Sequence, residues 1–279
     1  MILAAQEDHS AICAFLRRHL ATSMFPLSNL LRYGMSGDHP HTMKVWLRRH
    51  AGEIVDLLAL SRAGVVFPQC PNSSWDDVKS NLSERKITGI LGDDAQVADL
   101  RRVLNLPDGP VLDTREPLYH LPLGQLDVPE HDEFSLHALE VAPRELVVGW
   151  RQELINEAIP RPDLDAEQRA RDDIASYIER DSHRVLYLRG KPVAMTGFNA
   201  TIPEAVQIGG VYTPPAFRSR GFARRAVALH LQQAREKSVG HAILMAASNQ
   251  AAKAYEAIGF SQVGHFRMSF YARPQVVHD

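Results

Sequence analysis

The residues best suited to chemistry lie at positions 211–226, where an apolar strand pattern leads through a proline-containing loop into a helical pattern that begins at Gly221. The first amides of a helix have no partner within the helix and carry the positive end of its dipole. Such a helix start suits a phosphate or a pyrophosphate, and glycine lets the anion approach the backbone. Positive charge is added by Arg218, Arg220, Arg224 and Arg225. A basic helix face that only contacts solvent is the alternative interpretation.

Motifs of several other enzyme classes are absent from the sequence. It contains no Gly-Lys-Ser/Thr of a P-loop and no Gly-x-Gly-x-x-Gly after a strand. It also lacks His-Glu-x-x-His, Cys-x-x-Cys and Gly-x-Ser-x-Gly, so the motifs that zinc and serine hydrolases require are absent. His39-Pro-His41 is an isolated pair, and we assign no metal to it or to the rest of the chain.

Two motifs in the second half resemble those of one enzyme family. Arg218-x-x-Gly221-x-Ala223 is similar to the Arg/Gln-x-x-Gly-x-Gly/Ala acetyl-coenzyme A signature of the GNAT N-acetyltransferase superfamily. Asn249-Gln-Ala-Ala-Lys-Ala-Tyr255 resembles the segment that follows in that superfamily, where an Asn opens the helix after the next strand. The order and the spacing of the two motifs agree with the family.

The resemblance covers about residues 132–279 and implies a fold and a cosubstrate. It implies an α+β domain in which helices flank a central, mostly antiparallel mixed sheet, and it implies that the domain uses acetyl-CoA. Backbone amides from Arg218 to Arg224 would cradle the pyrophosphate of that molecule. By this resemblance the cofactor-binding residues are Val211, Tyr212, Thr213, Arg218, Ser219, Arg220, Gly221, Phe222, Ala223, Arg224 and Asn249.

Two glycines precede these residues in the expected strand that ends at Tyr212. In the family the pantetheine arm pairs like an extra strand with this splayed edge, which implies contacts with Val211 and Thr213. Gly209-Gly210 would form the bulge that creates the splay. The amide of Val211 would then polarise the thioester carbonyl, because a fixed donor stabilises the negative charge that develops on its oxygen. A role of the two glycines in packing alone is the alternative.

Tyr255 and Asn249 each allow two interpretations. A phenol near the sulfur atom can donate a proton to the departing CoA thiolate, so we assign Tyr255 as a catalytic residue. The alternative is a core aromatic side chain. Asn249 either caps the helix that it opens, which is worth about 1 kcal/mol, or reaches the cofactor arm.

The attacking amine needs a base, because an ammonium ion has no lone pair to offer. Glu204 lies just before the strand that leads to the cofactor, and it is the second catalytic candidate, acting through water. A solvated turn residue is the alternative. We expect His183 at the surface and His230 half-buried with satisfied hydrogen bonds.

Hydrophobic periodicity orders the second half as a strand, two helices, an antiparallel meander of three strands, a helix, a strand, a helix and a closing strand. The expected ranges are 134–141, 143–158, 165–179, 185–188, 193–200, 206–212, 221–237, 242–246, 250–258 and 266–271.

The first half shows two helices followed by a strand meander. Segment 25–34 and this order resemble the degenerate GNAT-like domain that precedes the acetyltransferase domain in some two-domain GNAT proteins. A stretch with Gly, Pro and several acidic residues, 123–133, marks the boundary. We therefore expect a degenerate N-terminal domain over 1–125, which completes the acceptor cleft, and a catalytic domain over 132–279.

Composition limits the partners and the location of the protein. The 279 residues have a formal net charge of -2, which argues against a nucleic-acid-binding surface. No apolar run approaches the roughly 20 residues of a membrane helix, so we expect no membrane contact. Two cysteines are too few for a disulfide scaffold and fit a reduced cytoplasmic setting.

These observations lead to one functional hypothesis and one alternative. The chain is expected to be an N-acetyltransferase that transfers the acetyl group of acetyl-CoA directly to a primary amine of a small molecule or a peptide terminus, as a monomer or homodimer. The alternative is a non-catalytic CoA-binding sensor or partner-binding protein, because no clear general base is evident in the sequence.

Overall fold

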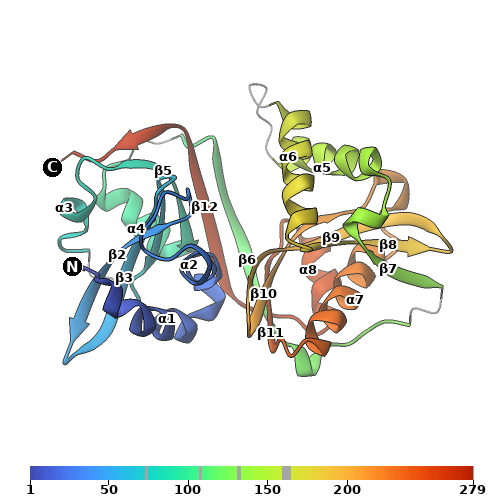
Figure 1. Ribbon diagram of the computed structural model, residues 1–279, viewed down its shortest axis with the longest axis horizontal. Helices are drawn as coiled ribbons and strands as arrows, with labels where there is room; N and C mark the ends of the chain where they lie inside the picture. Colours follow the sequence, from blue (N-terminus) through green and yellow to red (C-terminus); the bar gives the residue numbers. More distant parts are fainter. Residues whose placement is uncertain (73–74, 107–108, 131–132, 159–164, 279) are drawn as a thin grey trace. The chain divides into compact units, whose positions relative to one another are not determined.

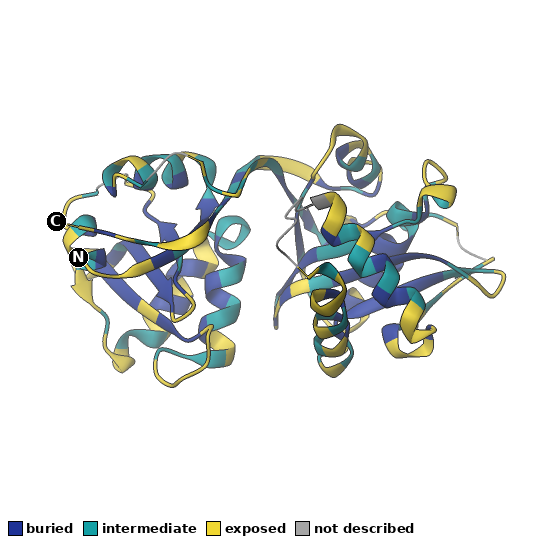
Figure 2. Ribbon diagram, turned by 90° about the horizontal axis from the view of Figure 1, so that it is seen from above, coloured by how far each residue is buried: buried dark blue, intermediate teal, exposed yellow. Residues whose placement is uncertain are grey.

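The structure is a computed structural model that describes residues 1–72, 75–106, 109–130, 133–158 and 165–278. The chain forms two units (Figure 1): unit 1 comprises Met1–Leu118 with Val263–Asp279, and unit 2 comprises Tyr119–Gln262. In each unit, buried strands lie beneath helices whose outer faces are exposed (Figure 2).

Unit 2 is a mixed sheet between two pairs of helices. Its strands lie in the order β7, β8, β9, β10, β11, β6. The β10–β11 pair is parallel, whereas the pairs from β7 to β10 are antiparallel. Its elements are β6 (Leu112–Pro122, which enters from unit 1), β7 (Phe134–Ala138), α5 (Arg144–Ala158), α6 (Ala166–Glu179), β8 (His183–Leu188), β9 (Lys191–Ile202), β10 (Ala205–Tyr212), α7 (Phe222–Glu236), β11 (His241–Met245) and α8 (Asn249–Glu256).

The two helix pairs cover opposite faces of this sheet (Figure 1). One core cluster joins Val147 of α5 and Ile174 of α6 to β8 and β9, and another joins Val227 of α7 and Tyr255 of α8 to β10 and β11. Apolar residues at helical spacing account for this packing, since such a stripe must be buried against a sheet. The pairs thereby fix the start of α7 at one end of β10.

The sequence also sets where these helices begin. The Asp165 carboxylate accepts a hydrogen bond of 2.9 Å from the Gln168 amide and so caps α6. By contrast, α7 starts after Gly221, whose φ of 76° is left-handed and which provides no side-chain cap. The first amides of α7 are therefore left without a side-chain acceptor.

Unit 1 repeats the element order of unit 2. It contains β1 (Ile2–Leu3), α1 (His9–Arg18), α2 (Leu20–Tyr33), β2 (Met43–His50), β3 (Glu53–Ser61), β4 (Val65–Gln69), α3 (Val78–Leu82), β5 (Lys86–Asp93), α4 (Asp94–Val103) and most of β12 (Ser261–Val276). Its strands lie in the order β1, β2, β3, β4, β5, β12, with β4 and β5 parallel. The predicted α+β class, with mixed sheets flanked by helices, is confirmed.

The C-terminal strand belongs to the first unit, which differs from the expected domain ranges. β12 pairs antiparallel with β5, with Phe266 opposite Asp93 and Phe270 opposite Gly89. Residues 263–279 therefore count with unit 1 although they follow unit 2 in the chain. A closing strand is placed by the sheet edge with which it pairs, and sequence position does not reveal that edge. Of the expected boundary segment, residues 131 and 132 lie outside the described residues.

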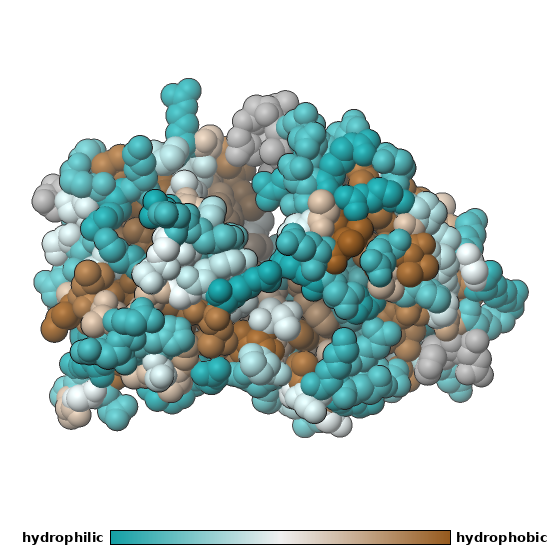
Figure 3. Space-filling view, viewed as in Figure 1, coloured by the Kyte–Doolittle hydropathy of each residue, from teal (hydrophilic) through white to brown (hydrophobic). Residues whose placement is uncertain are grey.

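The surface carries few large apolar side chains. Figure 3 shows a mostly hydrophilic face with apolar groups between hydrophilic ones. Exposed examples are Ile2, Val141 and Val263, which come from different elements and are ordinary for a folded surface. Within the part of the chain that the structure describes, no helix combines the length and the apolar character needed to cross a membrane.

The contact between β5 and β12 can be tested at Gly89. A Cβ there would lie 2.5 Å from the Phe270 ring and 2.9 Å from the Ser269 carbonyl oxygen. We expect Gly89→Ala to lower the free energy of unfolding by about 1–3 kcal/mol, because β12 must shift. In the control Gly149→Ala, the new Cβ meets nothing within 4 Å, and alanine favours the helix by about 0.5–1 kcal/mol. Thermal unfolding followed by circular dichroism measures both; an unchanged midpoint for Gly89→Ala contradicts the pairing.

Candidate functional site

Strands β10 and β11 pair over only part of their length. Their register runs from Ala205 opposite His241 to Gln207 opposite Ile243, and it extends no further among the described residues. A cavity of ≈ 440 Å³ opens beyond this point, lined by both strands, by the loop after β10 and by the starts of α7 and α8.

The cavity brings together most of the residues expected at the cofactor. Of the expected cofactor-binding set it is lined by Val211, Tyr212, Thr213, Arg218, Ser219, Gly221 and Ala223, and of the expected catalytic pair by Tyr255. Further lining residues include Glu157 of α5, Met245 of β11, and Ser248 and Gln250 at the start of α8.

The expected bulge at Gly209-Gly210 is present. The β9–β10 register shifts between Gly209 and Tyr212, and Gly210 has a left-handed φ of 62°. Side chains also fill the space beside both glycines: a Cβ would lie 1.8 Å from the Asn199 amide nitrogen at Gly209 and 2.5 Å from His183 Nε2 at Gly210. The glycines therefore form the bulge and also leave room for neighbouring side chains, so both the bulge and the packing interpretation apply.

The start of α7 forms an open cradle of backbone amides. The first intrahelical hydrogen bond runs from the Arg225 amide to the Gly221 carbonyl at 3.1 Å, so the amides of residues 222–224 precede the regular helical bonding. A Cβ at Gly221 would meet only Arg224 Nη2, at 3.7 Å. The loop before it turns through Ser219, whose φ of 60° is also left-handed. This arrangement fits a bound diphosphate.

A buried polar atom in the wall of the cavity supports the same fit. Thr213 Oγ1 has no hydrogen-bond partner among the described residues, although it is shielded from solvent. Buried hydroxyls normally find a partner, and a ligand in the cavity would provide one. The residues present therefore fit a CoA molecule along this edge.

Arg218 contributes to the loop and not directly to the cradle. Its Nε donates to the Thr213 carbonyl oxygen at 2.9 Å and its Nη2 donates to Glu157 at 2.6 Å. About half of each side chain is exposed, at 44% and 48%, so solvent screens the ion pair and its stabilisation is modest. The guanidinium closes the loop onto α5, while the backbone amides beyond it remain available.

The start of α8 differs from the expectation for Asn249. Ser248 is the N-cap, since its hydroxyl accepts a hydrogen bond of 3.2 Å from the Ala251 amide. The capping role considered for Asn249 is therefore wrong, and Asn249 is absent from the residues that line the cavity. Gln250 instead donates to Ser219 Oγ at 3.2 Å and ties α8 to the loop.

Three other expected cofactor residues also lie outside the lining. Phe222 is buried and its ring lies 5.8 Å from that of Phe134. The Arg220 guanidinium lies over the Phe222 ring at 5.0 Å. Arg224 Nε is buried without a partner among the described residues. None of the three side chains lines the cavity, although Arg224 Nη2 lies beside the helix start, 3.7 Å from the position of a Cβ at Gly221.

Tyr255 reaches the cavity from α8 and is also part of the core. It is 7% exposed and packs 6.1 Å from the Phe260 ring, between centroids. Burial raises the pKa of its phenol to about 12, so the hydroxyl stays protonated at neutral pH. No hydrogen bond of this hydroxyl occurs within the described part of the chain, which leaves it free to donate to a ligand.

Glu204 lies away from the cavity. It occupies the turn before β10, where its carbonyl oxygen accepts hydrogen bonds from Gly240 and His241. Val211 is seven positions further along the chain, a distance of roughly 20 Å along an extended strand. The geometry therefore gives no support to its expected role as the base. Among the described residues, no group of three or more His, Cys, Asp or Glu could hold a metal ion.

Two histidines are more buried than expected. His183 is fully buried instead of exposed: its ring stacks 3.6 Å from that of Tyr177, and Ser182 Oγ lies 2.9 Å from its Nδ1. Its Nε2 has no partner in the described part of the chain. His230 is 3% exposed and its Nδ1 is also unpartnered, so the expectation of a half-buried, satisfied histidine is wrong as well.

Comparison with protein families agrees with this geometry. The model of the acetyltransferase (GNAT) family matches residues 148–260, which contain the cavity, the loop and the start of α7. Residues 148–260 form a GNAT-family acetyltransferase domain. A comparison of the chain with curated proteins finds no match.

Solved structures similar to this chain share its fold. An acetyltransferase from the GNAT family of Colwellia psychrerythraea is 15% identical with a TM-score of 0.53, and the match covers 97% of this chain and 100% of the other. A GCN5-related N-acetyltransferase from Sphaerobacter thermophilus is 13% identical with a TM-score of 0.59 over 100% and 96%. A tandem GNAT protein from the clavulanic acid biosynthesis pathway is 14% identical with a TM-score of 0.53 over 96% and 97%.

Several residues at the cavity were not identified from the sequence. Glu157 and Gln250 become site residues only through the packing of α5 and α8, and no local pattern distinguishes them from other polar helix residues. The burial of His183 was missed as well: His183, Gly197 and Gly209 lie in register across three strands, and the two glycines leave room for the ring. That register was not available from the sequence.

The buried histidines predict that the protein is sensitive to acid. Burial lowers the pKa of His183 and of His230 well below 6.5. Below about pH 6.5 the unfolded chain therefore binds more protons than the folded chain. Above that pH the free energy of unfolding keeps its full value, and below it the free energy of unfolding decreases by up to about 1.4 kcal/mol per pH unit for each histidine. We expect the midpoint temperature of thermal unfolding to decrease as the pH is lowered below 6.5. The decrease should be less steep in His230→Phe than in the wild type. A variant of exposed His137 should keep the wild-type slope; equal slopes in all three contradict the assignment.

Proposed function

We propose that the GNAT domain transfers the acetyl group of acetyl-CoA directly to a primary amine of a small molecule or a peptide terminus. The observation that supports this most is the divergence of β10 from β11 beside the open start of α7. An extended arm with a diphosphate at one end and a thioester at the other matches the shape of that cavity.

In this proposal the loop and the first turn of α7 bind the pyrophosphate through backbone amides. Gly221 leaves space for the anion, and Gln250 holds the loop by its hydrogen bond to Ser219. Helix-terminal amides and their dipole stabilise the negative charge. The side chain of Arg218 then acts by fixing the loop to Glu157.

The bulge would place the Val211 amide at the thioester. Gly210 and Val211 have no register partner on β9 in the described structure, because the pairing shifts from Gly209 to Tyr212. An unpaired amide can donate to the carbonyl oxygen, which gains negative charge when the amine attacks. The new C–N bond forms as the C–S bond breaks, and the electron pair leaves on sulfur.

Tyr255 would protonate the departing thiolate. Its hydroxyl carries a proton at neutral pH and borders the cavity. Donation from a nearby acid lowers the barrier to expulsion of a poor leaving group. The base that accepts the proton of the amine has no candidate in the cavity wall, because the one carboxylate among the described lining residues, Glu157, is paired with Arg218.

Unit 1 would not bind CoA phosphates in the same way. Its helix α3, which corresponds in order to α7, has five residues and follows Asp77 in place of a glycine. A carboxylate at that position repels an anion. We infer that unit 1 supports the GNAT domain and the acceptor. We also infer that the protein is a monomer or homodimer. Its buried free thiols, Cys13 and Cys70, suit the cytoplasm.

One assay separates an enzyme from a CoA-binding sensor. Purified protein is incubated with acetyl-CoA and a panel of small-molecule amines and peptides, and release of free CoA thiol is followed. Steady release that depends on an amine supports the transferase. Tight CoA binding by calorimetry without release across the panel contradicts it and favours the sensor.

Gly221→Glu tests the placement of the pyrophosphate. The carboxylate would add bulk and negative charge at the helix start, so we expect the affinity for CoA to fall at least about 100-fold, as for a lost set of charge-assisted hydrogen bonds. Gly52→Glu is a matched control, because Gly52 also has a left-handed φ, 87°, and open space at its Cβ position. Calorimetry measures both variants. Unchanged affinity in a folded Gly221→Glu protein removes the proposed phosphate site.

Tyr255→Phe tests the proton donor. The substitution keeps the ring in the core and removes only the hydroxyl, so we expect turnover to fall by roughly 10- to 100-fold. Affinity for CoA should change less than about twofold, since the phosphates supply most of the binding. Steady-state kinetics together with calorimetry separates the two effects. Full activity would leave Tyr255 as a packing residue.

A further inference from the structure

Unit 1 contains a second cavity, of ≈ 460 Å³, away from its α3 start. Its wall is formed by the loop after α2, the start of β2, the end of β3, and the residues that lead into β5. The basic side chains in the wall are Lys44, Arg62, Arg85 and Lys86, and none of the described lining residues is acidic. This concentration of positive charge stands out in a chain whose net charge is -2.

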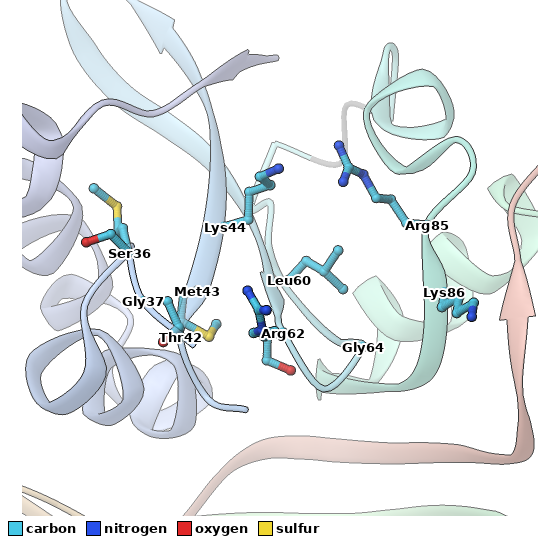
Figure 4. A pocket seen from close by; sticks show the side chains of 12 residues that line it. Ser36, Gly37, Thr42, Met43, Lys44, Leu60, Arg62, Gly64, Arg85 and Lys86 are labelled. Carbon is cyan, nitrogen blue, oxygen red and sulfur yellow. The ribbon is translucent and has the colours of Figure 1, made fainter. Parts of the chain in front are cut away.

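Figure 4 shows how these side chains are directed. Lys44 and Arg85 point toward one another from opposite walls, Leu60 lies between the two walls, and Arg62 lies below Lys44, whereas Lys86 points away. Like charges that converge without an acid repel each other, and a bound anion removes that repulsion.

The charges in the cavity can be counted. Arg62 is already balanced by Asp38, whose carboxylate lies 3.0 Å from its Nη2. Lys44 and Arg85 have no acidic partner in the described part of the chain. Two uncompensated positive charges match a phosphate monoester, which carries a charge of about -1.5 to -2 at neutral pH.

The remaining wall combines aliphatic side chains with the hydroxyl residues Ser36, Thr42 and Ser61. Leu60 and Met43 are 8% and 1% exposed and line the cavity, which gives it an aliphatic side. Thr42 also lines it, is 7% exposed, and its Oγ1 has no hydrogen-bond partner in the described structure. A ligand with an apolar group and an oxygen-rich end would satisfy both features.

We propose that this cavity of unit 1 binds a small phosphate monoester that carries an apolar group, with Lys44 and Arg85 contacting the phosphate and Leu60 and Met43 contacting the apolar part. The proposal is independent of acetyl transfer, because the cavity contains none of the residues that line the site in unit 2.

Calorimetric titration of the full chain with phenyl phosphate tests the proposal. Saturating CoA is present, so that the α7 start is filled. We expect Lys44→Ala and Arg85→Ala each to weaken phenyl phosphate binding about tenfold or more, as expected for lost charge-assisted hydrogen bonds. Lys237→Ala is the matched control and should change binding less than twofold, because the same charge is removed from an exposed side chain that lines neither cavity. Inorganic phosphate, without the apolar group, and benzoate, with less charge, should both bind more weakly than phenyl phosphate.

Two further arms keep the result unambiguous. All three side chains are exposed, so circular dichroism should give the wild-type thermal midpoint for each variant. In Gly221→Glu without CoA, phenyl phosphate binding should persist. Loss of binding in Gly221→Glu, an equal loss in Lys237→Ala, or no binding up to roughly 10 mM, a free energy too weak for a specific site, would each overturn the proposal.

Discussion

The site in unit 2 depends on one constraint, which is that β10 and β11 stop pairing after Gln207 and Ile243. Parallel strands that stayed in register would consume the backbone groups of β10 and leave no space between them. Because the two strands stop pairing, the cavity extends between their ends. The loop after β10 then leads to the start of α7. Residues of the bulge and of the helix start thus line the same cavity.

The bulge in β10 packs against side chains of the neighbouring strands β8 and β9. His183 and Asn199 fill the space beside Gly210 and Gly209, and the His183 ring is held against the sheet by Tyr177. A Cβ at Gly210 would meet the buried His183 ring, so the bulge has little freedom to relax there. The rigid edge that results is suited to holding an amide donor at a fixed position, which is what stabilisation of developing charge requires.

The two units use the same order of elements with different electrostatics. Unit 2 places a glycine and free amides at the start of α7, whereas unit 1 places Asp77 at the start of the short α3. In unit 1 the uncompensated positive charge lies elsewhere, at Lys44 and Arg85. The same order of elements can therefore carry open amides at a helix start in one unit and a carboxylate at the corresponding position in the other, because the fold positions backbone groups and side chains decide their charge environment.

The sequence by itself determined the local features of this protein. Apolar periodicity set the helices and strands, and the Arg218-x-x-Gly221-x-Ala223 motif identified the helix start, because glycine, proline and helix amides act over a few residues. Tertiary structure alone decided that Glu157 pairs with Arg218, that Ser248 and not Asn249 caps α8, that Glu204 lies far from the cavity, and that β12 closes unit 1. The burial of His183 belongs to this second group. Each of these depends on which distant segments pack or pair with one another, and that choice is set by the free energy of the whole fold and not by neighbouring residues.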